Sequence, residues 1–425
     1  MFTSLASVAT LMISTIMMMA GFGLMNFVVP VRSLAEGWST FTISLTATGY
    51  TLGFTISCIV TPIFVRRVGH VRVFSALITL LTVSILSCAL VVDWRAWFFF
   101  RGIAGFAIAG AYLVIESWLN ERVTNENRGA LYSVYMVTCL TGSIGGQYVV
   151  PLGDPSGYGL FILCGLIFSL ALFPTALSTA QSPAPIAQAR FDLAKLYRRS
   201  PVAFIGSLLA GAVSGTWGSL GGVYSQSIGM STAQGATLLS VFLAGGAIAQ
   251  IPIGRISDRI DRRYVMVFCG IFGTISCIGM ALFSGFGTVP LYVTGFFVGC
   301  VLYPIYALNA AHANDLANPD EYVTISSGVM ILYGLGTVSG PLMAGTLMDS
   351  IGPQGLIWFL ATAFALYAGY AAWRMTRRTE AVADADKADF QAMAIPVLGT
   401  DQANAANSAI GDADADPVFQ GQAGS

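Results

Sequence analysis

The sequence predicts an all-α membrane protein built as two similar halves of about six transmembrane helices each. Composition, a dozen apolar segments and a sided distribution of basic residues lead to this prediction. Hydrophobic residues make up 55% of the 425 residues and charged residues only 10%, whereas soluble chains carry about 25% charged residues. The mean hydropathy is +0.73. At roughly 20 apolar residues per span, the chain has room for about twelve spans.

Apolar runs of membrane length divide into two sets separated by a polar stretch. The first set lies at 5–30, 41–64, 73–92, 97–119, 129–151 and 158–178, and the second at 201–224, 233–254, 264–284, 289–312, 323–347 and 354–373. We therefore expect an N-terminal six-helix bundle over 1–178, a cytoplasmic linker over 179–200 and a C-terminal bundle over 201–378. Residues 379–425 are rich in Ala, Asp, Gln and Gly, which predicts a disordered acidic cytoplasmic tail.

The basic residues follow the positive-inside rule. Of the 20 Arg and Lys residues, 17 lie in the even-numbered connections or the tail, whereas the odd-numbered connections hold only Arg32 and Arg95. This bias predicts a multi-pass protein of the cytoplasmic (inner) membrane with both termini in the cytoplasm. Both termini on one side require an even number of spans, which agrees with twelve.

The two sets also repeat each other. The connection after the second segment carries Arg66, Arg67 and Gly69, and the connection after the eighth carries a similar basic cluster around Asp261. Gly69 and Asp261 stand 192 residues apart, and Gly142 meets Gly334 at the same offset. A half-length repeat is typical of transporters, because two packed bundles can move about a site between them.

The second copy of this connection reads Gly254-xxx-Asp258-Arg259-x-Asp261-Arg262-Arg263. It resembles the cytoplasmic loop signature of the major facilitator superfamily, Gly-xxx-Asp-Arg-x-Gly-Arg-Arg, except that Asp261 replaces a Gly. The first copy is degraded, with Pro62 and Arg66 in place of the Gly and the Asp. The resemblance covers about residues 1–378.

Further residues resemble the YcaD-like group of bacterial facilitators. They are Glu116-Ser117, Asn127-Arg128-Gly129, Tyr135-Met136, Gln147, Pro252-Ile253-Gly254-Arg255 and Tyr303-Pro304. The superfamily resemblance implies two pseudo-symmetric six-helix bundles, alternating access to a midplane cavity lined by spans 1, 4, 7 and 10, and a monomer.

The resemblance also implies a conformational latch at the signature loops. In the family the acid equivalent to Asp258 meets a neighbouring arginine and a helix N-terminus across the bundle interface, where the helix dipole favours an anion. The candidate latch residues are Gly254, Asp258, Arg259, Arg262 and Arg263, with Arg66, Arg67 and Gly69 in the first half. Glu121 or Glu126 is a candidate partner for Arg66 or Arg67. The alternative is a solvated loop that only sets topology.

Two charged residues lie inside predicted spans. Glu116 is a candidate for proton coupling or cation binding, since burial of a carboxylate is costly and raises its pKa. The alternative is a buried ion pair with Arg128 or Arg67. Arg101, early in span 4, is a candidate for binding an anionic substrate group through its guanidinium fork. The alternative is that it snorkels to the outer interface.

Polar and aromatic residues of spans 1, 7 and 10 are candidates for contacts to the solute. They are Asn26, Trp217, Tyr224, Tyr303, Tyr306 and Asn309. The alternative for each aromatic side chain is bundle packing or contact with lipid. Tyr303-Pro304 is also expected to break span 10 locally, and His312 is interpreted as a surface histidine at the cytoplasmic end.

Several function classes are excluded by missing motifs. The sequence has no GxxxxGK[ST] loop, no HExxH, no cysteine–histidine cluster and no nucleophile motif. We expect no enzyme activity, cofactor, metal or nucleic-acid partner. The seven cysteines all lie in apolar runs and are interpreted as packing residues. Residues 190–199 predict a short basic helix that lies on the inner leaflet or serves as an ordinary linker.

The leading interpretation is a secondary transporter of a small organic solute in the lipid bilayer, with proton coupling as an added hypothesis. Multidrug efflux is an alternative within the same class. A facilitator-fold protein that no longer transports, and serves assembly, sensing or lipid handling, is an alternative of another class.

Overall fold

The computed structural model describes residues 2–120, 128–176, 192–318 and 321–377. The first half contains α1 (Phe2–Ala35), α2 (Thr40–Val68), α3 (His70–Leu90), α4 (Trp94–Asn120), α5 (Arg128–Gln147), the short 3-10 helix η1 (Val150–Leu152) and α6 (Gly159–Ala176). The second half contains α7 (Leu193–Arg199), α8 (Pro201–Ser227), α9 (Thr232–Arg259), α10 (Arg262–Phe283), α11 (Thr288–Leu302), α12 (Pro304–Asn314), α13 (Tyr322–Ile351) and α14 (Gln354–Arg377). The predicted tail, residues 379–425, lies outside the described residues.

Twelve helical spans account for this arrangement. Ten are long and apolar enough to cross a membrane by themselves, and α5 and α6 take the fifth and sixth positions. The tenth span consists of α11 and α12, which are interrupted at Tyr303. Pro304 follows directly and has no N–H to donate to the preceding turn, so the interruption falls where the sequence predicted it.

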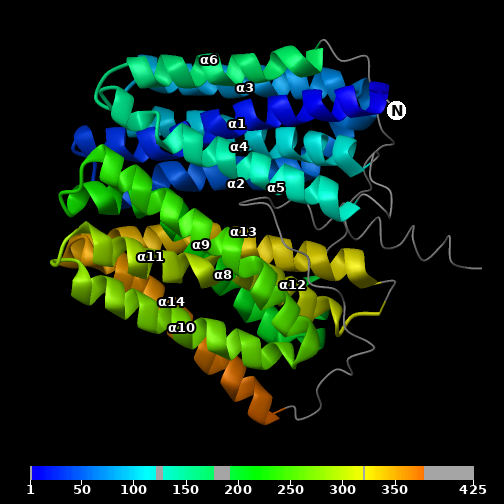
Figure 1. The fold of residues 1–425 in the computed structure, drawn as a ribbon, viewed down its shortest axis with the longest axis vertical. Helices are drawn as coiled ribbons and strands as arrows, with labels where there is room; N and C mark the ends of the chain where they lie inside the picture. Colours follow the sequence, from blue (N-terminus) through cyan, green and yellow to red (C-terminus); the bar gives the residue numbers. More distant parts are fainter. Residues whose placement is uncertain (1, 121–127, 177–191, 319–320, 378–425) are drawn as a thin grey trace, which may run out of the picture.

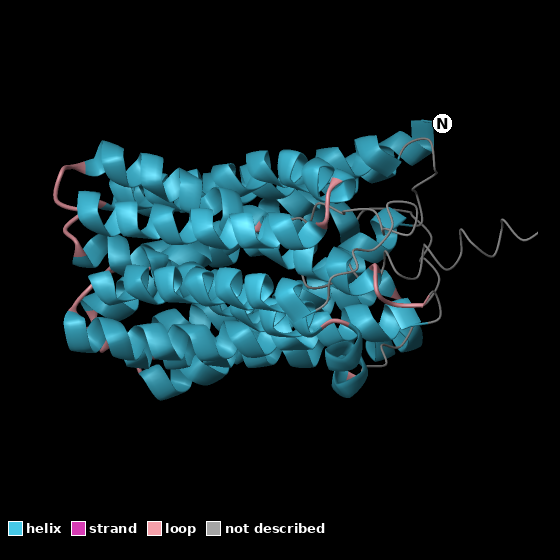
Figure 2. Ribbon diagram, turned by 90° about the horizontal axis from the view of Figure 1, so that it is seen from below, coloured by secondary structure: helices cyan, strands magenta, loops and turns pink. Residues whose placement is uncertain are grey.

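The helices form two bundles that lie side by side, α1 to α6 in one and α8 to α14 in the other (Figure 1). Seen from a second direction, the helices run between two ends where the connections gather (Figure 2). The linker end holds α7, the end of α2 and the start of α10. The far end holds the end of α1, the start of α2 and the end of α13. Among the described residues there is no strand, and the predicted fold class is confirmed.

The expected repeat is visible in the helix boundaries. Helices α2 and α9 begin at Thr40 and Thr232, and α3 and α10 begin at His70 and Arg262; both pairs stand 192 residues apart. The offset found from the loop residues is therefore the offset of the two bundles.

Each bundle has its own apolar core, and its outer surface is also apolar. Phe74, Trp97 and Phe168 are fully buried in the first bundle, and Phe364 in the second. Large apolar side chains are also exposed on the outside, such as Ile59 at 63%. On a soluble protein such an apolar surface would promote aggregation, whereas in a bilayer it contacts lipid. All described helices except the short α7 and η1 can therefore contribute to a membrane-embedded body.

The basic linker helix α7 packs on the second bundle. Leu196 is fully buried in a small cluster with residues of α8, α12 and α13. Lys195 Nζ and Arg199 Nη2 lie 2.8 and 3.0 Å from the two carboxylate oxygens of Glu321, just before α13. Asn318 N–H also donates to this carboxylate. The expected basic helix is present, and it is held by protein contacts on its apolar side.

The charge on Glu321 is therefore predicted to hold α7 in place. The Lys195 ammonium, then the Asn318 N–H and the Arg199 guanidinium, lower the pKa of Glu321 from 4.5 to about 2. A lowered folded-state pKa stabilises the protein at pH values above the unfolded pKa, and this stabilisation declines as the pH falls from 4.5 towards 2.

We expect Glu321→Gln to lower the thermal unfolding midpoint at pH 7 in detergent and to speed amide exchange in residues 193–199. The difference from wild type should shrink below about pH 4. Equal amide exchange in both proteins at pH 7 would show that the ion pairs do not hold α7.

Candidate functional site

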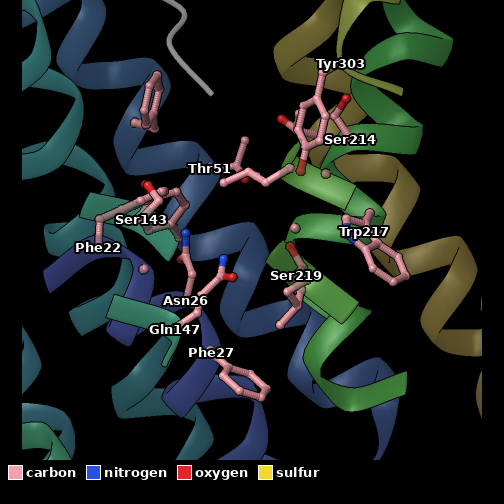
Figure 3. Close-up of a pocket in the computed structure, with 18 of the residues that line it drawn as sticks. Phe22, Asn26, Phe27, Thr51, Ser143, Gln147, Ser214, Trp217, Ser219 and Tyr303 are labelled. Atoms are coloured by element: carbon pink, nitrogen blue, oxygen red, sulfur yellow. The ribbon is translucent and has the colours of Figure 1, made fainter. Parts of the chain in front are cut away.

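A cavity of about 160 Å³ lies between the two bundles. Its volume is close to that of an engineered protein cavity that takes up benzene, so it suits a solute of about one ring. In Figure 3, Asn26 and Gln147 of the first bundle point into the space that Ser214 and Ser219 of α8 face from the other side. Both bundles therefore contribute to one polar and aromatic chamber.

Eight spans line this cavity, twice the number that the family resemblance implied. Spans 1, 4, 7 and 10 contribute through α1, α4, α8 and Tyr303, as expected. The other lining residues come from α2, α5, α9 and α13, which lie at the interface of the bundles. The prediction was incomplete because it followed the family pattern and gave no weight to the helices that form the seam.

The predicted site residues divide into two groups. Asn26, Arg101, Trp217 and Tyr303 line the cavity. Tyr224, Tyr306 and Asn309 are buried but do not line it.

Two members of the second group, Asn309 and Tyr306, have structural partners. The Asn309 amide donates to the Ile305 carbonyl at 2.9 Å and accepts from the Tyr367 hydroxyl at 3.3 Å. The Tyr306 ring packs edge-on against Tyr333, with centroids 4.6 Å apart. On span 10, Tyr303 therefore lines the cavity, whereas Tyr306, three residues later, packs in the core of its own bundle.

Arg101 is the charged residue of the cavity wall. Its side chain is only 6% exposed, so it does not snorkel to a surface. The guanidinium carbon lies 4.6 Å from the ring centroid of Tyr50, a cation–π contact. Its Nε and Nη1 are buried and form no hydrogen bond with a described residue. The structure thus places an incompletely satisfied cation beside the cavity.

Glu116 lies elsewhere, inside the first bundle. It is 1% exposed and is absent from the cavity wall. The Tyr135 hydroxyl donates to its Oε1 at 3.4 Å. Fifteen residues separate it from Arg101 on α4, about 22 Å along the helix. Of the two expected ion-pair partners, Arg67 is exposed, and the Arg128 side chain lies outside the described residues.

Some cavity residues were not predicted. Tyr50 and Tyr333 had no recognisable motif, and Ser214 and Ser219 lie among small residues of span 7. Gln147 had been noted only as part of the family resemblance. For Gln147 the sequence offered one signal. It is a polar residue near the end of a glycine-containing span, and such a residue needs a partner inside the protein.

Hydrogen bonds join the bundles at the far end. The Asp349 carboxylate in the last turn of α13 accepts from the Thr40 and Phe41 N–H groups at 2.8 and 3.0 Å. These are the first amides of α2, whose N-terminus favours an anion. The Ser44 hydroxyl donates to the Pro341 carbonyl at 2.8 Å. These hydrogen bonds therefore connect helices α2 and α13 at the far end, beyond the cavity.

A second seam on the same side joins α5 to α9. The Ser240 hydroxyl donates to Gln147 Oε1 at 3.0 Å, and the Tyr148 and Thr237 hydroxyls lie 3.0 Å apart. Both seams therefore join the two bundles on the far side of the cavity.

The candidate latch residues of the second half form a cluster at the linker end. Arg262 is buried, and its Nη1 lies 2.8 Å from Asp258 while its Nε lies 2.8 Å from Asp315. The cluster thus ties the end of α9 and the start of α10 to the residue after α12. His312 nearby is 6% exposed, so its interpretation as a surface histidine was wrong.

The departure of Asp261 from the family signature has a structural reason. Gly69 has φ +85°, a conformation that favours glycine, whereas Asp261 has φ −55°. Asp261 also caps α10 and pairs with Arg263 at 2.6 Å. Burial alone would raise the pKa of Asp261, but the hydrogen bonds from Arg263 outweigh burial and hold the pKa below its usual range.

The other candidate latch residues lie at the same end. Arg66, Arg67 and Arg259 are exposed, and Gly254 is buried. Glu121 and Glu126, the suggested partners of the first-half arginines, lie outside the described residues.

The two acids around Arg262 are predicted to differ in importance. The Asp315 side chain is 2% exposed and that of Asp258 is 38% exposed. Asp315→Asn leaves a buried guanidinium with less charge compensation and should destabilise the protein by about 3 kcal/mol or more. Asp258→Asn should cost less than about 1 kcal/mol. Unfolding midpoints in detergent measure both, and equal losses would contradict this ranking.

Comparisons with known proteins agree with this geometry. The profile of the Major Facilitator Superfamily matches residues 11–239 and 202–418. An uncharacterized MFS-type transporter of Yersinia pestis (strain Pestoides F) is 26% identical over 335 residues, which cover 76% of this chain and 84% of the relative. The MFS-type transporter YcaD of Salmonella newport (strain SL254) is 25% identical over 368 residues, which cover 85% and 94%.

Two solved structures share the fold. A variant of the nucleoside transporter NupG superposes with a TM-score of 0.76 at 14% identity, covering 86% of this chain and 99% of that one. A bacterial homologue of the lysosomal transporter Spinster, in an inward-facing and occupied conformation, gives 0.67 at 13% identity, covering 91% and 98%. These matches confirm the expected transporter fold and the YcaD-like resemblance. The protein is a multi-pass membrane protein that belongs to the Major Facilitator Superfamily.

Proposed function

We propose that this protein is a secondary active transporter that carries a small organic solute by alternating access. The observation that carries the proposal is the chamber between two repeated bundles, to which both bundles contribute side chains. Such a chamber can open to either side if the bundles rock about it, since its walls belong to separate bodies. The far-end seams and the linker-end cluster supply contacts that such a motion would break and make.

The proposed orientation places the linker end in the cytoplasm of a bacterial-type inner membrane. The linker end carries the basic pairs Arg66–Arg67 and Arg262–Arg263. At the far end, Arg32 is occupied by protein groups: it pairs with Glu36 at 2.6 Å and donates to the Ser156 carbonyl. The excess of basic residues at the linker end supports this orientation.

Under this proposal the structure corresponds to a state closed on the outer side. The hydrogen bonds of Asp349 and Ser44 to the partner bundle lie at the far end, beyond the cavity. A Cβ atom on Gly345 would meet the Ser44 hydroxyl oxygen at 2.5 Å and the Thr40 carbonyl oxygen at 2.9 Å. The seam therefore needs glycine at this position to close.

Spin labels on each end can test alternating access. Val68 with Ile260, at the linker end, and Val91 with Phe283, at the far end, are exposed pairs related by the 192-residue offset. We expect the two label distances to change in opposite directions between states. Gly345→Ala should lengthen the far-end distance and shorten the linker-end distance. Six of the seven cysteines are buried, so the labelled protein needs Cys300→Ser.

Gly145→Ala is the matched control for this experiment, because a Cβ there meets no atom within 4 Å. Fixed distances at both ends, unchanged by Gly345→Ala, would contradict alternating access.

Proton coupling through Glu116 is the second part of the proposal. Its burial and its Tyr135 contact place an ionisable carboxyl inside the first bundle, away from the solute chamber. A carboxyl in such a setting can exchange a proton as the bundle packing changes.

We expect Glu116→Gln in proteoliposomes to abolish solute accumulation driven by a proton gradient while solute exchange without a gradient persists. Glu36→Gln, an exposed acid at the far end, is the control. Undiminished accumulation in Glu116→Gln would leave the carboxyl a structural role only.

Multidrug efflux is supported by one observation, the aromatic wall formed by Phe22, Phe54, Trp217 and Tyr303. It predicts many chemically unrelated ligands, whereas a specific transporter has a narrow set. A protein that binds but gives no flux in proteoliposomes would instead match the non-transporting alternative.

A further inference from the structure

The chamber is positively charged. Among the described residues that line it, Arg101 carries the charge and none is a carboxylate. Glu116, on the same helix, lies about 22 Å away by helical rise. A single positive charge in a partly desolvated chamber raises the local concentration of anions and repels cations.

The guanidinium of Arg101 lacks hydrogen bonds to part of its N–H groups among the described residues. Tyr50 covers one face, and a cation–π contact leaves the in-plane N–H groups available. Nε and Nη1 are buried without a hydrogen-bond partner among the described residues. Retaining a buried arginine in this condition is unfavourable, and a bound oxyanion would relieve it by accepting those N–H groups.

The other polar groups of the chamber can support an oxyanion or its ring substituents. Ser240 donates to Gln147 Oε1, so the amide N–H groups of Gln147 remain as donors. Asn26 lies beside Gln147 and points to the same space (Figure 3). Both side chains are neutral donors, so Arg101 is the group that would compensate the negative charge of an oxyanion.

Aromatic residues also line the chamber. The Trp217 ring stacks on Phe242 with centroids 3.6 Å apart and planes 13° apart, and Trp217 lines the chamber. Phe22, Phe54 and Tyr303 add further aromatic side chains to the lining, which suits a planar ring. The 160 Å³ volume admits about one such ring.

From these observations we infer that the substrate class is a small monocarboxylate that carries a planar ring, with its carboxylate on Arg101. One guanidinium matches one negative charge, and its planar fork matches a carboxylate. This inference rests on the proposed transport function for its biological meaning, but binding itself can be tested without transport.

The test uses benzoate as the probe, benzamide as its neutral counterpart and benzylamine as its cationic counterpart. In detergent-solubilised full-length protein, benzoate should raise the unfolding midpoint with increasing concentration, and the other two should not. Arg101→Met should weaken benzoate binding by roughly 30-fold or more, the loss expected when one partner of a buried charge pair is truncated. Arg101→Lys should bind benzoate more weakly than wild type but better than Arg101→Met.

The ligand-free proteins provide an independent measurement. Because Arg101 has unsatisfied N–H groups, Arg101→Met should unfold at a higher temperature than wild type. Arg262→Met, which removes a cation that is paired with Asp315, should unfold at a lower temperature. Arg95→Gln on the exposed start of α4 is the control and should change neither stability nor benzoate binding.

Equal stabilisation by benzoate and benzamide, or undiminished benzoate binding by Arg101→Met, would overturn the inference. So would a ligand-free Arg101→Met that unfolds as early as Arg262→Met, because Arg101 would then already have its partner. Flux separates the two proposals. Benzoate binding without flux in proteoliposomes would refute transport and keep the anion site, whereas flux of neutral solutes alone would refute the anion site and keep transport.

Discussion

Inside a membrane, a polar group has to find its partner within the protein, because lipid offers none. The described helices show how this constraint is met. Thr15, Ser33 and Ser207 hydroxyls donate to carbonyl groups one turn earlier, and Asn309 is held between a carbonyl and a tyrosine. Arg262 is surrounded by carboxylates. Arg101 is one of the exceptions, since it lines the chamber while its Nε and Nη1 form no hydrogen bond with a described residue. The need for internal partners therefore points to Arg101 as the position where a solute would bind under the proposed function.

The two bundles repeat in backbone but differ in chemistry. Their helices begin 192 residues apart, yet the first turn between helices needs the positive φ of Gly69, while the second uses the cap and ion pair of Asp261. The buried Arg101 and Glu116 belong to the first bundle, whereas the buried His312 and the ion pairs of Arg262 belong to the second. Under the proposed function, the first bundle recognises and couples, while the second holds the linker and its own cytoplasmic end.

Hydropathy was sufficient to predict the helical spans, because span length is a property of local sequence, and the family resemblance implied the two bundles. The break at Tyr303-Pro304 followed from proline alone. The site was predicted only in part. Arg101 and Asn26 could be singled out as polar residues in spans, but Tyr50 and Asp349 act through partners that are distant in sequence. For Asn309 and Tyr306, the direction of each side chain decides between core and cavity, and helical spacing did not determine it. His312 was misplaced because its burial depends on how α10 and α12 pack.

The closure at the far end joins a side-chain acceptor to main-chain donors. Asp349 binds the amides of Thr40 and Phe41, and every residue except proline carries such an amide. The identity of the two residues at the start of α2 is therefore free to drift while the contact survives. On the other side of the seam, the carboxylate and the small Gly345 have no such latitude. The Asp349 contact therefore constrains the side chains of α13 more than it constrains those of Thr40 and Phe41 at the start of α2.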